Sequence, residues 1–211
     1  PGMGKALALD TPIATPEGWT TMGELQVGDK VLDEHGRPCS VTYTSPVFVG
    51  NRCFRLHFDD GSTIVADADH RWLVSAPDRS DARVTTTLEM VDGGYRTDAG
   101  APRLHVPVAM VELPEVDVPV DPYDLGGALD GEAIPAEYLR ASWKQRLALL
   151  QGLMDAAGSL TEVGVEISVP RRSLAAQVRE LVCSLGHKPG PIEESGAGWR
   201  LSWMPLDPVF R

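Results

Sequence analysis

Apolar and polar residues alternate between Cys53 and Phe58, which is the pattern of a strand with one buried face. The sequence Asp-Asp-Gly at 59–61 supplies turn residues, and residues 62–66 return as a second run rich in β-branched side chains. We therefore predict a β-hairpin here. It leads directly into three side chains of distinct chemistry, Asp67, His70 and Trp72.

The start of the chain also follows a strand pattern. Between residues 6 and 32, short apolar runs are interrupted by Thr-Pro, Glu-Gly and Gly-Asp pairs, which are typical of turns between short strands. Residues 111–122 alternate apolar and acidic positions with repeated prolines, which predicts an extended connector or edge strand. We place the end of a first domain near residues 121–131.

Past residue 131 the hydrophobic period changes to that of a helix. Apolar positions recur at helical spacing over 143–155, with Gly158 just beyond, and we expect a helix there. A second helix is predicted over 173–185, with Ser173 as its N-cap. The remaining apolar runs predict four short strands, at residues 159–163, 165–169, 189–194 and 199–204.

The composition limits the class of protein. The 211 residues are enough for one large or two modest domains, and 43% of them are hydrophobic. No apolar run approaches the roughly 18 residues that a transmembrane helix needs. The three cysteines, at positions 39, 53 and 183, have no metal-ligand spacing. We therefore expect no metal, no cofactor, and a reducing, cytoplasmic setting.

Charge is unevenly distributed along the chain. Residues 1–131 hold 10 Lys and Arg against 21 Asp and Glu, whereas residues 132–211 hold 9 of each. The whole net charge of −11 therefore lies in the first part. Because an acidic surface repels phosphate, we expect DNA binding to be weak or absent.

Residues 1–5, Pro-Gly-Met-Gly-Lys, match the end of a phosphate-binding loop. In a complete loop the next residue carries a hydroxyl that coordinates Mg²⁺, but here it is Ala6. On these few residues alone, chance is the simpler explanation. The motif nevertheless stops where the strand pattern begins.

Two blocks of the sequence resemble inteins of the Hint fold. Residues 6–32 are similar to the first block of such an intein, and residues 61–75 to the block that contains the catalytic histidine, here His70. Two later runs also resemble strands of that fold, at residues 84–88 and 103–108. The resemblance covers residues 6–121 and implies an all-β, horseshoe-shaped Hint domain for protein splicing.

This resemblance gives the interrupted phosphate-binding loop a meaning. An intein inserted between Lys5 and a following Ser or Thr would disable an ATPase until the intein was excised. The host would then resemble a replicative helicase of the DnaB type, and residues 1–5 would be the tail of the preceding host segment, the N-extein. The expected partners are therefore the host segments on either side of the intein.

The second part of the chain resembles one half of a LAGLIDADG homing endonuclease. The order of helix, hairpin, helix and hairpin matches, and the run Leu150–Gly158 resembles the signature motif. The residue before the closing glycine normally binds metal, but here it is Ala157, with Asp155 two positions earlier. We expect residues 132–211 to form a degenerate, LAGLIDADG-like α+β domain.

An upstream copy of the motif is reduced to residues 125–131, which include Asp130 and lie in an expected linker over 122–131. Two-metal cleavage of a phosphodiester needs carboxylates from both motif helices. Endonuclease activity on the intein-less host gene is the alternative function, and it would require a carboxylate at position 157 and a basic face. The sequence has neither.

The first residue of this intein-like region has no nucleophile. Ordinary inteins begin with Cys or Ser, which attacks the preceding carbonyl, whereas this region begins with Ala6. Ala6 is either an inactivating substitution or the mark of inteins that use a cysteine from a C-terminal block. The spacing of His70 and Trp72, with Asp67 where other inteins have Thr, favours the second interpretation.

In that mechanism the resemblance assigns roles to three side chains. His70 would protonate the nitrogen of the Lys5–Ala6 peptide bond, because an amide anion is a very poor leaving group. Asp67 would orient the imidazole and raise its pKa. Trp72 would pack beneath the junction, with an ordinary place in the core as the equal alternative.

The acyl group would pass to a cysteine in a C-terminal block that this sequence does not contain. None of its three cysteines has the expected strand context, and no closing His-Asn pair is found. We therefore expect the chain to be a fragment of a longer precursor. The other histidines, at positions 35, 57, 105 and 187, are expected to be surface or strand residues.

Overall fold

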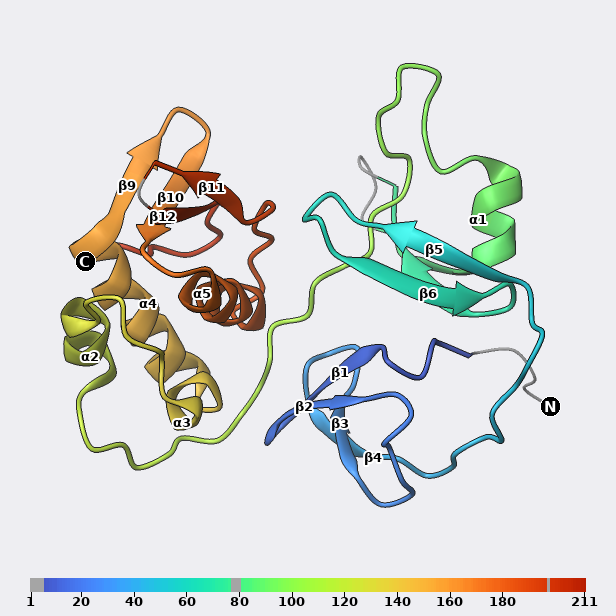
Figure 1. Ribbon diagram of the computed structural model, residues 1–211, viewed down its shortest axis with the longest axis horizontal. Helices are drawn as coiled ribbons and strands as arrows, with labels where there is room; N and C mark the ends of the chain where they lie inside the picture. The colour runs from blue at the N-terminus through green and yellow to red at the C-terminus, as the bar shows by residue number, and fades with distance from the viewer. Residues whose placement is uncertain (1–5, 77–80, 197) are drawn as a thin grey trace.

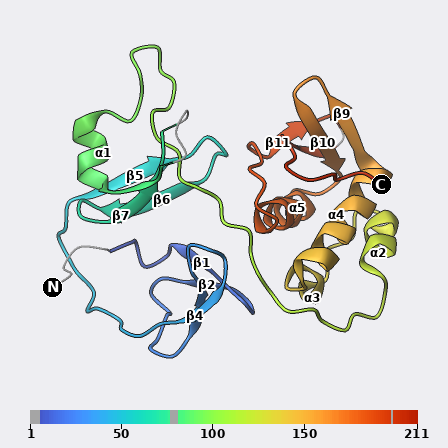
Figure 2. The same cartoon turned by 180° about the vertical axis from the view of Figure 1, so that it is seen from behind.

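The computed structural model describes residues 6–76, 81–196 and 198–211. The chain forms two lobes joined by an extended segment, residues 106–118, which contains no helix or strand. Figure 1 shows this segment, and Figure 2 shows it from behind. Each lobe has a hydrophobic core of its own, a small one around Trp72 and a larger one around helices α4 and α5. The tail predicted at residues 1–5 lies outside the described residues.

The first lobe is built from short antiparallel hairpins. Each of its sheets contains two strands among the described residues, paired as β1-β2, β3-β4, β5-β6 and β7-β8. The strands are β1 Pro12–Thr15, β2 Gly18–Thr21, β3 Lys30–Leu32, β4 Pro38–Ser40, β5 Cys53–His57, β6 Thr63–Asp67, β7 Arg71–Val74 and β8 Arg83–Thr86. The hairpin predicted from the alternation after Cys53 is confirmed as β5 and β6.

A short helix interrupts the lobe that was expected to be all-β. The strand predicted over 84–88 ends at Thr86, and helix α1 (Thr87–Gly93) follows it. The Thr86 side chain accepts from the Glu89 N–H while the Glu89 carboxylate accepts from the Thr86 N–H, and this reciprocal cap starts a helix. The strand predicted over 103–108 is also wrong, because only His105 is paired there, with Ser75.

The segment 122–131 was expected to be a linker but contains helix α2 (Pro122–Ala128). Asp121 caps the helix by accepting from the backbone N–H groups of Tyr123 and Asp124, and Pro122 is a favoured first residue because it has no N–H to satisfy. Pro122, the last of the prolines that predicted an extended connector over 111–122, therefore begins a helix.

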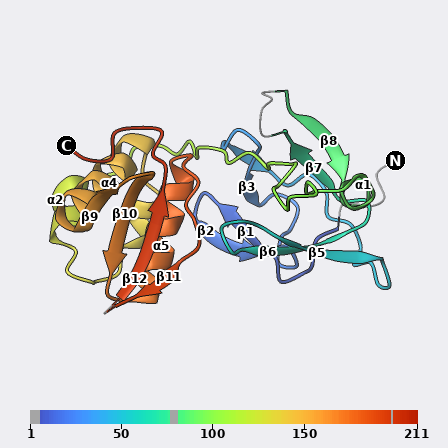
Figure 3. The ribbon, with the colours of Figure 1, turned by 90° about the horizontal axis from the view of Figure 1, so that it is seen from above.

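The second lobe is a four-stranded antiparallel sheet with helices packed against it (Figure 3). The strand order is β11-β12-β10-β9. The remaining elements are α3 Ala136–Leu139, α4 Trp143–Ala157, β9 Gly158–Thr161, β10 Gly164–Val169, α5 Arg172–Ser184, β11 Glu193–Ser195 and β12 Gly198–Trp203. The helix predicted over 143–155 and its following hairpin are confirmed, whereas α5 begins at Arg172 without the expected side-chain cap from Ser173.

Helices α2 and α4 pack backbone against backbone. A Cβ on Gly152 would overlap the carbonyl oxygen of Tyr123, and one on Gly126 would overlap that of Leu149. Only glycine at both positions allows this approach. None of the helices in the described ranges is both long and apolar enough to cross a membrane.

Arg146 joins α4, α5 and the extended segment between the lobes. Its side chain is fully buried and donates to the carbonyl oxygens of Ala141 (2.9 Å), Ser184 (2.7 Å) and Val111. Burial lowers the pKa of this guanidinium to about 10, with a smaller contribution from the positive charge of Arg140. The segment between the lobes is thus held by a buried cation that carbonyl oxygens solvate.

Candidate functional site

The first described residues of the chain pair with β6. The Asp67 N–H donates to the Ala6 carbonyl oxygen at 3.0 Å, and the Ala8 N–H donates to the Val65 carbonyl oxygen at 2.9 Å. Leu7 lies opposite Ala66 in an antiparallel bridge. The segment 6–8 therefore pairs with the edge of β6 through an isolated bridge and two hydrogen bonds, and Ala6 lies at the Asp67 end of β6. Lys5, on the other side of the predicted junction, is outside the described residues.

Asp67 is the last residue of β6 and is only 3% exposed. Its Oδ2 accepts from the Asn51 side-chain amide at 3.1 Å, while its Oδ1 is buried and has no hydrogen-bond partner among the described residues. The Asp67 carbonyl oxygen accepts from the His70 N–H at 3.3 Å. The backbone of Asp67 thus lies between Ala6 and His70, in contact with both.

His70 lies half-buried in the turn between β6 and β7 (Arg71–Val74). The first turn of α1 holds this turn in place, because the His70 carbonyl oxygen accepts from the Thr87 N–H at 2.9 Å and the Ala68 carbonyl oxygen accepts from the Leu88 N–H at 2.9 Å. The imidazole contacts the indole of Trp72 edge-on, with ring centroids 4.9 Å apart and planes at 64°. The backbone of His70 is therefore held by α1, and its ring contacts Trp72.

Trp72 belongs to the core of the first lobe and is 7% exposed. Its Nε1–H donates to the Thr87 hydroxyl at 2.9 Å, and its ring lies 6.2 Å from that of Phe58. Leu7, the residue after Ala6, packs against the same core cluster. Trp72 is thus a core residue, as one of the two alternatives predicted, in a core that also holds the start of the chain.

Two residues of this site were not predicted from the sequence. Asn51 binds the buried carboxylate of Asp67 from just before β5, and nothing in its local sequence indicates this contact. Thr87, 1% exposed, links Trp72 to His70. The capping pattern of Thr86 and Glu89 was readable as the start of a helix and would have placed Thr87 in its first turn.

The residues of the predicted endonuclease motif lie apart from this site, in the second lobe. Asp155 is exposed near the end of α4 and accepts from the Tyr123 hydroxyl at 2.8 Å. Ala157 is the last residue of α4, and Asp130 follows the end of α2. Across residues 6–76, 81–196 and 198–211, no group of three or more His, Cys, Asp or Glu side chains is arranged to hold a metal ion.

The arginine of strand β12 in the second sheet is paired with acidic residues. Arg200 on β12 lies between two carboxylates, Glu193 at 2.8 Å and Glu166 at 3.9 Å. Its positive charge is therefore compensated within the sheet, which leaves it poorly suited to bind phosphate.

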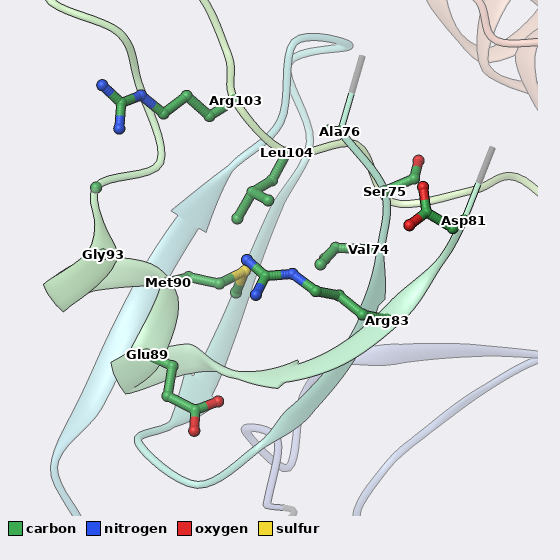
Figure 4. A pocket seen from close by; sticks show the side chains of 11 residues that line it. Val74, Ser75, Ala76, Asp81, Arg83, Glu89, Met90, Gly93, Arg103 and Leu104 are labelled. Carbon is green, nitrogen blue, oxygen red and sulfur yellow. The ribbon is translucent and has the colours of Figure 1, made fainter. Parts of the chain in front are cut away.

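A hollow of about 420 Å³ lies at the far end of the β7–β8 ladder from His70. Figure 4 shows that its side chains come from β7, β8, α1 and the segment that contains Arg103 and Leu104. Val74 and Arg83, which pair in the ladder, form one wall, whereas Arg71, next to His70, pairs with Thr86 at the opposite end. The hollow is thus separate from the cluster of Asp67, His70 and Trp72.

Comparison with known proteins gives two replicative helicases. No family model matches the chain. It is 34% identical to a replicative DNA helicase DnaB of Mycobacterium intracellulare over 252 residues, covering 89% of this chain and 44% of that protein. It is 40% identical to a replicative DNA helicase DnaB of Mycobacterium leprae (strain TN) over 117 residues, covering 56% of this chain and 19% of that protein. The chain spans less than half the length of either relative.

Solved structures of inteins are also similar to the chain. One crystal structure of the MchDnaB-1 intein is 40% identical and covers 49% of this chain and 71% of its own, with a TM-score of 0.37. A second structure of that intein is 36% identical and covers 48% of this chain and 74% of its own, with a TM-score of 0.37. The Msm DnaB1 intein splicing domain bound with zinc is 41% identical and covers 39% and 70%, with a TM-score of 0.33. Each of these three matches covers less than half of this chain.

Proposed function

The chain belongs to the intein family, with the MchDnaB-1 and Msm DnaB1 inteins among its relatives, and we propose that it acts in protein splicing. In this proposal residues 6–121 form the Hint-type splicing domain and hold the N-terminal splice junction, the Lys5–Ala6 bond. The resemblance of residues 6–32 and 61–75 to intein blocks supports the assignment, as does the sequence identity to solved inteins.

The host segments are proposed to come from a DnaB-type replicative helicase. Two curated relatives carry that name, and residues 1–5 match the end of the phosphate-binding loop that such an ATPase contains. An intein at this position would keep the nucleotide site of its host incomplete until splicing restores the hydroxyl that binds Mg²⁺.

One observation carries the proposal for the site, namely the hydrogen bond from the Asp67 N–H to the Ala6 carbonyl oxygen. A backbone bond at this position anchors the residue that follows the junction at the end of β6, three residues before His70. Effective general acid catalysis requires the acid to be positioned near its target, and backbone pairing supplies such a position without using any side chain of Ala6.

We infer the following chemistry. Because Ala6 has no nucleophilic side chain, a cysteine thiolate from a C-terminal block outside this chain attacks the Lys5 carbonyl carbon. A carbon–sulfur bond forms, the Lys5–Ala6 carbon–nitrogen bond breaks, and the electron pair goes to the Ala6 nitrogen. His70 gives that nitrogen its proton, a contribution typically worth about 10²–10⁴ in rate. The products are a thioester of the N-terminal host segment and a free Ala6 amine.

The neighbours of His70 would serve this proton transfer. The Trp72 indole restricts the imidazole by edge contact, and Asp67 holds the start of the turn through its carbonyl oxygen. The Asp67 carboxylate, whose Oδ2 is held by the Asn51 amide at 3.1 Å, is the group we propose to orient the imidazole, as the resemblance to inteins implies.

The second lobe is proposed to descend from a LAGLIDADG endonuclease that has lost its activity. The close packing of α2 on α4 through Gly126 and Gly152 supports two motif helices side by side. Ala157 cannot bind metal, and the compensated charge of Arg200 argues against a phosphate-binding sheet. Homing endonuclease activity on the intein-less host gene is therefore the less favoured function.

A splicing assay tests the proposal. The chain is joined to its natural downstream segment and to host segments on both sides, and the ligated host product is measured by mass spectrometry. We expect ligated product with Ala6 in place and little change in rate with Ala6→Cys. A large gain with Ala6→Cys would instead show that Ala6 is an inactivating substitution, and no ligated product from either precursor would contradict the splicing function.

A further inference from the structure

The turn of the β5–β6 hairpin is held by the second lobe. Arg179 on α5 forms an ion pair with Asp60, with Nη2 and Oδ2 2.6 Å apart, and Lys188 forms one with Asp59 at 2.9 Å. These residues come from different lobes and are more than 110 positions apart in sequence. Figures 1 and 2 show the β5–β6 hairpin extending toward α5.

The Arg179–Asp60 pair is the better-shielded of the two. Its side chains are 26% and 19% exposed, against 46% and 66% for Lys188 and Asp59. Ion pairs that water reaches contribute little, whereas breaking a pair withdrawn from water leaves an uncompensated charge. Arg179 is therefore the residue of this contact that we expect to matter most.

Hydrogen bonds within its own turn orient the Asp60 carboxylate for this contact. Its Oδ1 accepts from the Ser62 N–H at 2.8 Å and from the Ser62 hydroxyl at 2.6 Å, which leaves Oδ2 directed to Arg179. Burial alone would raise the pKa of this carboxyl, but the Ser62 bonds and then the Arg179 charge outweigh burial and hold the pKa below its ordinary value. Asp60 is thus ionised at neutral pH in a rigid turn.

The same hairpin carries the junction at its other end. Strand β6 runs from this turn to Asp67, and the segment 6–8 pairs along its edge. Within the described residues β5 and β6 form a two-stranded sheet to which the segment 6–8 adds one bridge, so few hydrogen bonds hold it together. A contact that holds its turn therefore also limits the opening of the bonds at Ala8 and Asp67.

We propose that the second lobe positions the junction-bearing hairpin of the first lobe, with Arg179 as the positioning residue, through the ion pair to Asp60. In its link to splicing this inference rests on the proposed function. It gives the second lobe a role that needs neither metal nor DNA.

Amide hydrogen exchange of this chain tests the proposal directly, because exchange reports the opening of individual hydrogen bonds. With Arg179→Ala, the amides of Ala8 and Asp67 should exchange at least about fivefold faster, as expected for a partly shielded ion pair. Arg179→Lys should restore most of the protection. The matched control is Arg200→Ala, which removes two ion pairs of the same lobe that do not reach the hairpin.

Two results would overturn the inference. Equal exchange at Ala8 and Asp67 in the Arg179→Ala and Arg200→Ala variants would show that the ion pair does not hold the hairpin. An equal acceleration in the strands of the second lobe, for example at Ile167, would show a general loss of stability in place of local positioning.

A second readout separates this inference from the splicing proposal. In the full precursor, Arg179→Ala should slow cleavage at Lys5–Ala6 by a factor similar to that seen in exchange, with an unchanged pH profile, because the acid itself is intact. Faster exchange together with a precursor that never cleaves would contradict the splicing function and leave the positioning role supported.

Discussion

The backbone N–H of Asp67 donates to the carbonyl oxygen of Ala6 across 3.0 Å. Through this bond, the first residue of the intein-like region lies at the end of the strand that leads into His70. The bond involves no side chain of residue 6, so a site of this kind accepts alanine at its first position. Replacing the residues that hold the turn between Asp67 and Trp72 should therefore destabilise this site.

Thr87 is the first of these residues. Replacing it by Val keeps the shape of the side chain but removes the oxygen that accepts from the Trp72 Nε1–H and donates to the His70 carbonyl. An unsatisfied buried donor costs about 1–3 kcal/mol, so we expect the free energy of unfolding to fall by that amount. Urea unfolding followed by tryptophan fluorescence measures it. Thr42→Val, on an exposed segment, is the control and should change stability little.

Gly152 tests the contact between α2 and α4. Gly152→Ala should destabilise the second lobe by about 1–3 kcal/mol or more, because the new Cβ overlaps the Tyr123 carbonyl and forces the helices apart. Gly127→Ala is the matched control. Its Cβ would lie 3.9 Å from the nearest atom, the Gly152 carbonyl oxygen, so it should be neutral or stabilising. Equal destabilisation by the two variants in thermal unfolding would contradict the close helix contact.

Asp60 gives a pH dependence of known sign. Its folded-state pKa lies below the ordinary value of 3.8, so the unfolded chain binds this proton more readily. The stability that Asp60 contributes is complete above the ordinary value and is lost as pH falls through it toward the folded-state value. The difference in unfolding free energy between the wild type and Asp60→Asn should therefore be largest at pH 6–7 and shrink below about pH 4. A difference in unfolding free energy that grows as the pH falls would contradict this prediction.

The proposed degenerate LAGLIDADG motif predicts that the chain does not cleave DNA. With Mg²⁺, the purified chain should not cut DNA that carries the intein-less host site, because Ala157 stands at the proposed metal position. Ala157→Asp alone should not restore cutting, since the upstream motif is largely missing. The measurement is the fraction of linearised plasmid relative to a reaction without protein. Site-specific cutting by either protein would restore the endonuclease hypothesis.

The sequence predicted those elements whose signals are local. The alternation at Cys53–Phe58 with its Asp-Asp-Gly turn gave β5 and β6, and the helical spacing after Trp143 gave α4. At residues 84–88 the β-branched run predicted a strand, but the cap formed by Thr86 and Glu89 started a helix inside it. A capping hydrogen bond at one or two residues can start a helix where β-branched residues favour a strand. The apolar pattern alone does not predict the structure at such positions.

Contacts between distant residues could not be read from the sequence. Asn51 and Thr87 support the candidate site only because the strands around them pair as they do. His187, expected at the surface or in a strand, is fully buried and accepts from the Leu206 N–H at 3.1 Å. Burial lowers its pKa, partly offset by Asp207. His187 is buried because the loop that contains it packs against the rest of the lobe, and the residues around it in sequence do not predict this packing.

His70 is proposed to activate the Lys5–Ala6 bond. The first-order rate of cleavage at this bond, measured in the full precursor with His70→Ala, tests this role. His57→Ala, a histidine on the neighbouring strand β5, is the control. Circular dichroism of both variants should match the wild type.

We expect His70→Ala to slow cleavage by about 10²–10⁴, the usual contribution of a general acid, and His57→Ala to leave the rate within about twofold of the wild type. Cleavage that continues at the wild-type rate in folded His70→Ala precursor would contradict the catalytic role of His70.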